Sequence, residues 1–428
     1  MAVPESDEIL AEDSLTDSLI ETLASLFDDY PHISIGVSGG SDSLALLILM
    51  THAARLGGGE ISVLTVDHGM RAASANEARF VSELCADLDV PHKTLQWTGE
   101  KPSTGRAARA REERYRLMTR YCVQQQIPAL AVAHTGDDQA ETLLMRLKRA
   151  ADQGSRRGMS GMSKRTLMSE GPGHATILLR PLLQESRAAL QIVLKSEGIP
   201  WIDDPTNLDM DYERVRMRAA LEDAGDLKRA LLKFGAMSGR YRHCVARDAA
   251  DLINGALRPS EAEGVVIDRK AFVNMPQNVS ELAFQAILSV IGGRDHLVPS
   301  EALSRALSHQ KTVTLARCVI RKHPESFVVA REKRDVPPVP HPESVPLLWD
   351  NRYWILPDAA RGLDASGNDD AHIAETKPVS GLIDHDKDIH TVRIYPRLGA
   401  FQTFVPEYDW RLRRSLGNAV RTLVHNLS

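Results

Sequence analysis

Short apolar runs alternate with longer segments of helical length from residue 33 onward. The runs have the length and aliphatic content of buried strands, and they lie at 33–37, 61–66, 93–97, 129–133 and 176–179. Parallel strands need crossover connections, and those crossovers are usually helices. The pattern therefore predicts an α/β protein with a parallel, doubly wound sheet that carries helices on both faces. Ligands of such sheets bind at the carboxyl ends of the strands.

The chain after this sheet predicts two smaller domains. A long helical pattern is followed by a hairpin pattern at 312–322 and 326–330. Five prolines between Pro337 and Pro346 then form a stiff linker that no helix can cross. The predicted domains are 1–224 for the sheet, 225–335 for an α-rich, substrate-binding region with a small hairpin, and 345–428 for a C-terminal α+β domain.

The predicted C-terminal domain has three recognisable segments. Strand-like stretches lie at 347–356 and 391–396, and a helical pattern starts at about Trp410. The polar segment 360–377 between the strands reads as a loop.

Composition agrees with a multidomain globular protein. The 428 residues exceed the size of a single core, and 43% hydrophobic and 25% charged residues exclude a disordered or collagen-like chain. An acidic N-terminus argues against an export signal, and no apolar stretch approaches the ~20 residues that span a bilayer. Four isolated cysteines indicate neither a disulfide framework nor a Cys-based metal site. We therefore expect a cytoplasmic protein without membrane contact.

Charge is unevenly distributed along the chain. A net charge of −5 argues against wholesale coating of nucleic acid. Nevertheless, 101–120 and 146–165 each contain seven Lys or Arg residues. Such stretches are often only solvated surface, but these two adjoin the motifs described next. We interpret them as a footprint for an RNA backbone.

A glycine-rich loop directly follows the first predicted strand. It reads Ser38-Gly39-Gly40-Ser41-Asp42-Ser43 and leads into an apolar helix. Glycines allow backbone amides to converge, and the serine hydroxyls and the helix amino end add donors and positive partial charge. These features suit phosphate oxygens, whereas the alternative is an ordinary βα turn with a Ser or Asp cap. The loop matches neither GxxxxGK(S/T) nor GxGxxG.

Carboxylates follow the predicted strand at 129–133. Asp138 and Glu141 are spaced i, i+3 on a starting helix, so they share one face and can jointly receive a cation. The alternative is that they merely stabilise a helix amino end. Because both strands belong to one sheet, we expect these carboxylates near the glycine loop, where they need a metal ion or an ammonium partner.

The glycine loop resembles the pyrophosphate loop (PP-loop) of the N-type ATP pyrophosphatases. The order of further motifs is similar to that of the tRNA(Ile)-lysidine synthetase family. Matches run from about 33 to 218, and beside the loop they are Asp67-His68-Gly69-Met70-Arg71, Ala110-Arg111-Glu112-Glu113-Arg114-Tyr115, Ala133-His134, Asp138-Gln139-Ala140-Glu141-Thr142, Gly158-Met159-Ser160-Gly161-Met162, Arg180-Pro181-Leu182-Leu183 and Asp204-Pro205-Thr206-Asn207.

The resemblance implies an adenine nucleotide alpha hydrolase-like fold and an ATP-dependent carbon–nitrogen ligase. The expected substrates are ATP, L-lysine and the isoleucine tRNA with a CAU anticodon. The C2 oxygen of the wobble cytidine would be adenylated with release of pyrophosphate. The lysine ε-amine would then displace AMP, giving lysidine, so that the tRNA reads AUA.

The resemblance also implies roles for individual residues. The glycine loop (Ser38, Gly39, Gly40, Ser41, Asp42 and Ser43) would bind ATP, with Asp42 holding Mg²⁺. Asp138 and Glu141 would bind lysine together with an arginine, taken as Arg218 while Arg214 and Arg216 stay open. His134 either contacts the adenylate or caps its loop. Arg111 is assigned to catalysis. Contacts to tRNA are assigned to Arg114, Arg149, Arg156 and Arg157.

Three features depart from the family pattern. The loop after Arg149 is longer, Val215 replaces a usual Asn, and the region after the proline linker has no evident counterpart. Three alternatives compete: another PP-loop adenylating enzyme that modifies tRNA, an ammonia-using NAD or GMP synthetase, and a catalytically silent ATP- or RNA-binding module. Isolated cysteines disfavour a thiolase, and the three carboxylates disfavour a silent binder. A homo-oligomer is compatible with the sequence, which does not fix the oligomeric state.

Overall fold

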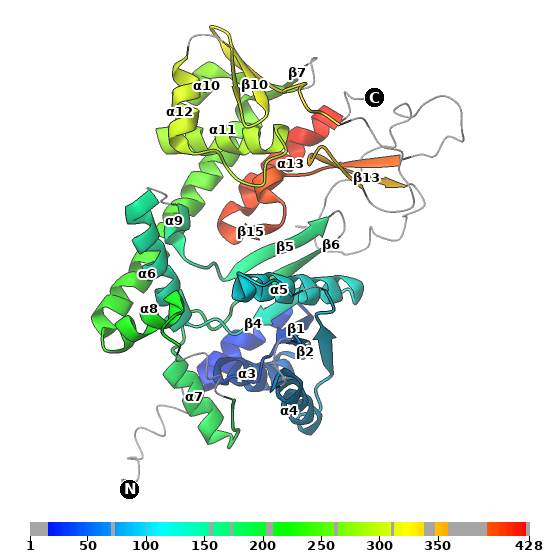
Figure 1. The fold of residues 1–428 in the computed structure, drawn as a ribbon, viewed down its shortest axis with the longest axis vertical. Helices are drawn as coiled ribbons and strands as arrows, with labels where there is room; N and C mark the ends of the chain where they lie inside the picture. Colours follow the sequence, from blue (N-terminus) through cyan, green and yellow to red (C-terminus); the bar gives the residue numbers. More distant parts are fainter. Residues whose placement is uncertain are drawn as a thin grey trace. The chain divides into compact units, whose positions relative to one another are not determined.

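The computed structural model describes residues 16–69, 73–99, 101–153, 157–171, 174–202, 209–260, 264–309, 312–337, 347–357 and 392–424 (Figure 1). The chain forms two compact units. Unit 1 contains residues 1–168 and 176–238, and unit 2 contains 169–175 and 239–428. The division into domains at 224 and 345 stays a prediction.

Unit 1 is built on the predicted parallel sheet. Its strands are β1 (His32–Gly36), β2 (Glu60–Asp67), β3 (His92–Gln96), β4 (Ala129–Val132) and β6 (His174–Leu179). They lie in the order β6-β4-β1-β2-β3, and each neighbouring pair is parallel. A strand that the pattern did not predict, β5 (Arg165–Gly171), lies beside β6. The α/β class and the doubly wound arrangement are confirmed.

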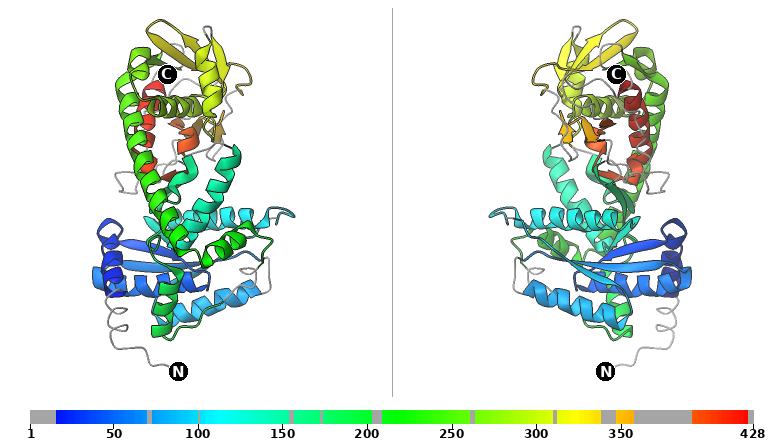
Figure 2. Two further views of the ribbon diagram at one scale, coloured as in Figure 1. Left: turned by 90° about the vertical axis from the view of Figure 1, so that its left-hand side faces the viewer. Right: turned by 90° about the vertical axis from the view of Figure 1, so that its right-hand side faces the viewer.

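Helices cover both faces of this sheet. They are α3 (Ser41–Gly57), α4 (Ala73–Asp87), α5 (Arg106–Gln124), α6 (Gly136–Gln153), α7 (Arg187–Ser196) and α8 (Glu213–Glu222). Figure 2 shows α5 on one face of the strands and α3 and α4 on the other. Helix α3 is buried along most of its length, which explains why it is apolar all round rather than amphipathic.

A hydrophobic core fixes α5 against the sheet. Met118 and Cys122 of α5 pack with Leu64 of β2, Leu130 of β4 and Leu178 of β6. Burial of a side chain of this size stabilises the fold by about 1.5–3 kcal/mol. The packing holds the carboxyl ends of these strands, and the residues that follow them, in a fixed array.

Unit 2 contains an antiparallel sheet and several helices. The strand order is β7 (Leu257–Ser260), β8 (Gly264–Asp268), β11 (Ser326–Arg331), β10 (Cys318–Lys322) and β9 (Val313–Leu315). The helices are α9 (Gly225–Ala256), which begins in unit 1, α10 (Arg269–Val273), α11 (Gln277–Ile291) and α12 (Ser300–Ser308). The predicted hairpin is present as β10 and β11, but its first predicted strand, 312–322, is divided into β9 and β10 by a turn at Ala316 and Arg317.

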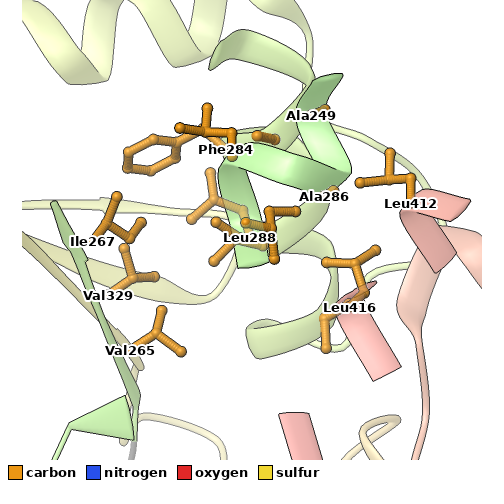
Figure 3. Packing of buried hydrophobic residues seen from close by; sticks show 14 of the residues in the cluster. Ala249, Val265, Ile267, Phe284, Ala286, Leu288, Val329, Leu412 and Leu416 are labelled. Carbon is orange, nitrogen blue, oxygen red and sulfur yellow. The ribbon is translucent and has the colours of Figure 1, made fainter. Parts of the chain in front are cut away.

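Residues from both sides of the proline linker share one hydrophobic core in unit 2. Figure 3 shows Phe284 and Leu288 of α11 facing Val265 of β8, with Leu412 and Leu416 of α13 (Trp410–Val424) in the same cluster. All five side chains are at most 2% exposed. The C-terminal helix is therefore an integral part of this core.

The predicted strand at 347–356 is two strands. Strands β12 (Leu347–Trp349) and β13 (Tyr353–Pro357) form a hairpin, and β14 (Val392–Pro396) pairs with β13. The turn contains Asp350 and Asn351 with φ values of 48° and 56°. Asn and Asp tolerate the left-handed conformation that such tight turns require, so this dipeptide was the missed signal. The predicted loop at 360–377 lies outside the described residues.

A buried carboxylate ties this turn to a second one. The Asp350 side chain is 0% exposed and accepts hydrogen bonds from Arg331 (3.0 Å), Arg352 (2.7 Å) and Arg317. Arg317 itself lies in the β9–β10 turn, with a φ of 62°. One carboxylate thus links the β9–β10 turn to the β12–β13 turn. Among the described residues, no helix is long and apolar enough to cross a membrane.

Candidate active site

The glycine loop connects β1 to α3 at the carboxyl end of the sheet. Gly39 has a φ of 86°, a conformation that an L side chain would strain. The Ser43 hydroxyl accepts from the Ser38 N–H at 3.1 Å and donates to the Gly40 carbonyl at 2.9 Å. These bonds hold the loop in a tight arc.

The amino end of α3 has no side-chain cap. Its N-cap residue is Gly40, which makes no side-chain hydrogen bond. The alternative reading of the loop, a turn capped by Ser or Asp, is therefore wrong. Backbone N–H groups at the start of a helix carry positive partial charge and suit an anion such as a phosphate.

Asp138 serves two purposes at the start of α6. The Thr135 N–H donates to its Oδ2 at 2.9 Å, and the Asp138 N–H donates to the Thr135 hydroxyl at 3.3 Å. This pair caps the helix, as the alternative reading of the carboxylates proposed. The second oxygen, Oδ1, instead faces guanidinium groups, which agrees with the cation reading.

Three carboxylates and three arginines of unit 1 form a continuous ionic group, here called the carboxylate–arginine cluster. Its members are Asp42, Asp138, Glu141, Arg187, Arg214 and Arg218. Arg214 donates to Glu141 at 2.7 Å and to Asp138 at 2.8 Å. Arg218 donates to Glu141 at 2.9 Å. Arg218, the arginine taken for lysine binding, and Arg214, one of the two left open, thus reach the lysine-binding candidates, whereas Arg216 contacts the backbone of Met210 and Asp211.

Arg187 completes the cluster, although no motif pointed to it. Its Nε donates to Asp42 at 3.1 Å, and its Nη2 donates to Asp138 at 3.4 Å. The glycine loop and the α6 carboxylates, separated by nearly a hundred residues in the sequence, therefore meet as predicted. Arg187 follows the Arg180-Pro181-Leu182-Leu183 motif, whose position at a strand end was the available signal.

Burial and neighbouring charge oppose each other in this cluster. The pKa of Asp42 is raised overall, mainly because burial disfavours its charge. The nearby Arg187 lowers this pKa, whereas the negative charge of Asp138 raises it further. Burial disfavours the charge on Arg214, but Asp138 and Glu141 outweigh it, so the pKa of Arg214 is raised. The formal charges of the three carboxylates and the three guanidiniums sum to zero. An added cation must therefore displace one of the arginines or arrive with negative charge.

Two arginines of α5 contact histidines. Nη2 of Arg111 lies 3.1 Å from Nε2 of His134, and Nη2 of Arg114 lies 3.2 Å from Nε2 of His68. Burial, followed by Arg111 and other arginines, holds the pKa of His134 well below its usual value. The Nδ1 atom of His134 is buried and has no hydrogen-bond partner among the described residues. Its hydrogen-bonding capacity is therefore unused within the part of the chain that the structure describes.

The other residues predicted to contact tRNA are Arg149, Arg156 and Arg157. Arg149 pairs with Glu213 at 2.6 Å and is 59% exposed. Arg156 lies outside the described residues, as do Met70, Arg71 and the Asp204-to-Asn207 motif. Arg157 begins the 3₁₀ helix η1 (Arg157–Ser160), and its side chain is not described.

Two residues that sequence reasoning missed, Arg146 and Asp137, support the site. Arg146 donates to the carbonyls of Gly158 (2.6 Å) and Gly161 (2.8 Å), which fixes the glycine-containing segment after α6. Asp137 accepts from the Arg187 backbone N–H at 2.8 Å and pairs with Lys228. Asp137 therefore anchors the start of α7.

The carboxylate oxygens beside the helix start fit a metal ion only if a bound nucleotide supplies further oxygen ligands. Among the described residues, no group of three or more His, Cys, Asp or Glu side chains could hold a metal ion. Asp42 supplies carboxylate oxygens beside the glycine loop, and Mg²⁺ is commonly held by one or two carboxylates plus phosphate oxygens and water. The site thus fits a magnesium ion that shares ligands with a nucleotide.

These features define a nucleotide-binding α/β protein of the PP-loop class. Residues 13–224 match the PP-loop domain family model.

Curated relatives narrow this class. A tRNA(Ile)-lysidine synthase of Ruegeria pomeroyi is 34% identical over 348 residues, covering 79% of this chain and 80% of that relative. One of Mesorhizobium japonicum is 36% identical over 340 residues, covering 76% and 73%. The chain belongs to the tRNA(Ile)-lysidine synthase family. Among solved structures, the U34-tRNA thiolase NcsA from Methanococcus maripaludis has 13% identity and a TM-score of 0.45, covering 53% of this chain and 78% of that one; nothing is concluded from this likeness.

Proposed function

We propose that this protein is an ATP-dependent ligase that forms lysidine at the wobble cytidine of the isoleucine tRNA with a CAU anticodon. One observation carries the proposal beyond family membership. Asp42 of the glycine loop and Asp138 with Glu141 on α6 belong to one cluster. A phosphate site and a site for a cationic substrate therefore adjoin each other, as a reaction between an adenylate and an amine requires.

The first step is adenylation. The cytidine C2 oxygen attacks the α-phosphorus of ATP, and pyrophosphate leaves. Such transfers depend on positioning and charge neutralisation. The uncapped amides at the start of α3 would hold the leaving pyrophosphate, and Asp42 would hold Mg²⁺, which neutralises phosphate charge when bound.

The second step consumes lysine. The ε-amine attacks C2 of the adenylated cytosine and releases a proton. The bond between C2 and the adenylated oxygen then breaks, and this oxygen leaves as part of AMP. Asp138 and Glu141 would hold the ammonium before it loses that proton. Arg218 or Arg214 would pair with the lysine carboxylate, because guanidinium and carboxylate form two parallel hydrogen bonds.

Arg111 and His134 would act on the nucleotide. In the neutral imidazole one nitrogen donates and the other accepts. Since Arg111 can only donate, His134 Nε2 accepts, and the proton lies on Nδ1. The unpartnered Nδ1–H would then donate to the adenylate or to the cytosine.

The proposed tRNA-binding surface draws on residues from several parts of the chain. Arg114, Arg149, Arg156 and Arg157 would contact RNA, and the Arg149 side chain is 59% exposed. The regions 225–335 and 345–428 would extend this surface. A cytoplasmic location and a homo-oligomer are part of the proposal.

A labelled-lysine assay tests the activity. Radioactive lysine, Mg-ATP and unmodified tRNA(Ile) with a CAU anticodon are incubated with the enzyme, and the RNA is counted after mild alkali, which removes aminoacyl esters. We expect alkali-stable label that depends on ATP and disappears when the wobble C is replaced. Pyrophosphate release without label would indicate a different nucleophile, and tRNA binding without either would indicate a silent module.

A further inference from the structure

Arg187 contacts two carboxylates to which the proposed function gives different ligands. Its guanidinium donates to Asp42, the magnesium candidate, at 3.1 Å and to Asp138, a lysine candidate, at 3.4 Å. Within the carboxylate–arginine cluster, the hydrogen bonds of Arg187 thus join the phosphate side to the lysine side.

The base of the Arg187 side chain is fixed. Its backbone N–H donates to Asp137 at 2.8 Å, and the preceding Ser186 caps α7 by accepting from the Ala189 N–H at 3.1 Å. The guanidinium, in contrast, is carried on a chain with several rotatable bonds, and the side chain as a whole is 24% exposed. It can therefore swing while its backbone stays in place.

The two bonds of Arg187 are the longest between the charged groups of the cluster. Arg214 and Arg218 bind their carboxylates at 2.7–2.9 Å, compared with 3.1 and 3.4 Å for Arg187. Longer charge-assisted hydrogen bonds are weaker. Of the three arginines, Arg187 is the one that an incoming cation displaces most easily.

Charge balance makes this displacement necessary. The cluster already pairs three carboxylates with three guanidiniums, so a lysine ammonium that reaches Asp138 must compete with Arg187 and Arg214. A cation at Asp42 would repel the Arg187 guanidinium, while the phosphates that accompany this cation offer it a new anionic partner beside the glycine loop. The same movement would free an oxygen of Asp138.

We infer that Arg187 couples the two substrate subsites: in the empty enzyme it occupies Asp42 and Asp138, and the magnesium–nucleotide complex displaces it, which opens Asp138 to the lysine ammonium. Arg187 is thus a positioning residue that makes lysine binding follow nucleotide binding. This inference rests on the proposed function, because it takes lysine and ATP as the ligands.

Calorimetric titration of L-lysine tests the coupling without tRNA and without turnover. Lysine is titrated into the full-length protein in the absence and presence of Mg²⁺ and the α,β-methylene analogue of ATP, which cannot be cleaved between the α and β phosphates. For the wild type we expect the analogue to tighten lysine binding at least tenfold, which corresponds to about 1.4 kcal/mol. By reciprocity, lysine must tighten binding of the analogue by the same factor.

The Arg187→Met variant separates coupling from a merely structural role. We expect it to bind lysine equally well with and without the analogue, at least as tightly as the nucleotide-bound wild type. Arg229→Met removes an exposed arginine that is paired with Asp226, and it should keep the wild-type dependence. If Arg187→Met does not fold, Arg187→Gln replaces it, and the wild-type titration remains decisive by itself.

The outcomes distinguish this inference from the proposed function. Equal lysine affinity with and without the analogue in the wild type overturns the coupling and leaves lysine recognition intact. Retention of the dependence in Arg187→Met also overturns it. Absence of lysine binding in every state, while the analogue binds, contradicts the lysine site itself.

Discussion

Nη2 of Arg111 lies 3.1 Å from Nε2 of His134, and this contact decides which nitrogen of the ring carries the proton. A guanidinium has no acceptor, so the neutral imidazole must be protonated at Nδ1. Burial and the surrounding arginines hold the pKa of His134 well below 6.5. The ring is therefore a neutral hydrogen-bond donor at physiological pH.

The tautomer of His134 is the first prediction. We expect ¹⁵N NMR of the His134 ring to show a neutral ring with the proton on Nδ1, unchanged from pH 8 to pH 6. In Arg111→Met the pKa should rise toward its ordinary value, because a positive neighbour has been removed. His243, an exposed histidine on α9, serves as the internal reference. A proton on Nε2 in the wild type would contradict the assignment.

His134 also affects stability, in a direction that its pKa fixes. A histidine with a lowered pKa in the folded state binds fewer protons there than in the unfolded chain. The free energy of unfolding should therefore fall as the pH drops below about 6.5. Urea unfolding at pH 7.5 and pH 5.5 measures this loss, which should be smaller in His134→Gln.

The two chemical steps should respond to different carboxylates. Asp42→Asn should abolish pyrophosphate release, because it removes charge from the proposed magnesium ligand. Glu141→Gln should raise the lysine KM at least tenfold and leave tRNA-dependent pyrophosphate release partly intact. Pyrophosphate release and lysine incorporation are measured separately on the same samples. Equal loss of both steps in Glu141→Gln would refute its role as a lysine ligand.

Gly39 should be required for nucleotide binding beyond its effect on stability. An Ala at a φ of 86° costs roughly 1–2 kcal/mol of strain, and relief of that strain would distort the loop. Gly58, at the other end of α3, has a φ of 66° and open space around it, so Gly58→Ala carries similar strain away from the site. We expect both variants to unfold at lower urea but only Gly39→Ala to lose affinity for the ATP analogue.

The buried carboxylate of unit 2 should be essential for its stability. Removing one partner from a buried ion pair costs about 3–5 kcal/mol, and Asp350→Asn leaves Arg317, Arg331 and Arg352 without their shared partner. Asp226→Asn, at an exposed pair, should cost less than about 1 kcal/mol. Urea unfolding measures both. A loss below about 1 kcal/mol in Asp350→Asn would contradict this role.

The effect of Asp350 should depend on pH. Burial raises its pKa, but the hydrogen bonds and charges of Arg331, Arg352 and Arg317 outweigh burial and lower it overall. A carboxyl with a lowered folded-state pKa contributes stability above its unfolded value, near 4, and loses this contribution as the pH falls through its folded value. The difference between wild type and Asp350→Asn should therefore shrink below pH 4.

Contacts to RNA should be visible as salt dependence. Replacing Arg156 and Arg157 together by Met should weaken tRNA binding and reduce the slope of log K against log salt by about 2, since each phosphate contact contributes about 1. Arg55→Met, which removes an exposed arginine at the carboxyl end of α3, is the control. Unchanged binding across a salt series would remove these residues from the footprint.

Local pattern predicted most of the architecture. Apolar runs and their spacing placed β1, β2, β3, β4 and β6 within one or two residues, because burial of alternate or successive aliphatic side chains is encoded locally. The turn at Asp350 and strand β5 escaped prediction. A continuous apolar stretch hides a two-residue turn, and β5 contains only two large apolar residues, Leu167 and Met168, so it lacks a strong aliphatic signature.

The candidate site was likewise only partly predictable from the sequence. The sequence determined the glycine loop, the spacing of Asp138 and Glu141, and the meeting of the two at the carboxyl edge of a parallel sheet. Only the tertiary structure decided that Arg187, 145 residues after Asp42, joins these groups and that Asp138 uses one oxygen as a helix cap. Helices and loops follow from interactions between neighbours in the chain. The partner of a charge follows from which side chains the packed helices bring within hydrogen-bonding distance, and no local pattern contains that information.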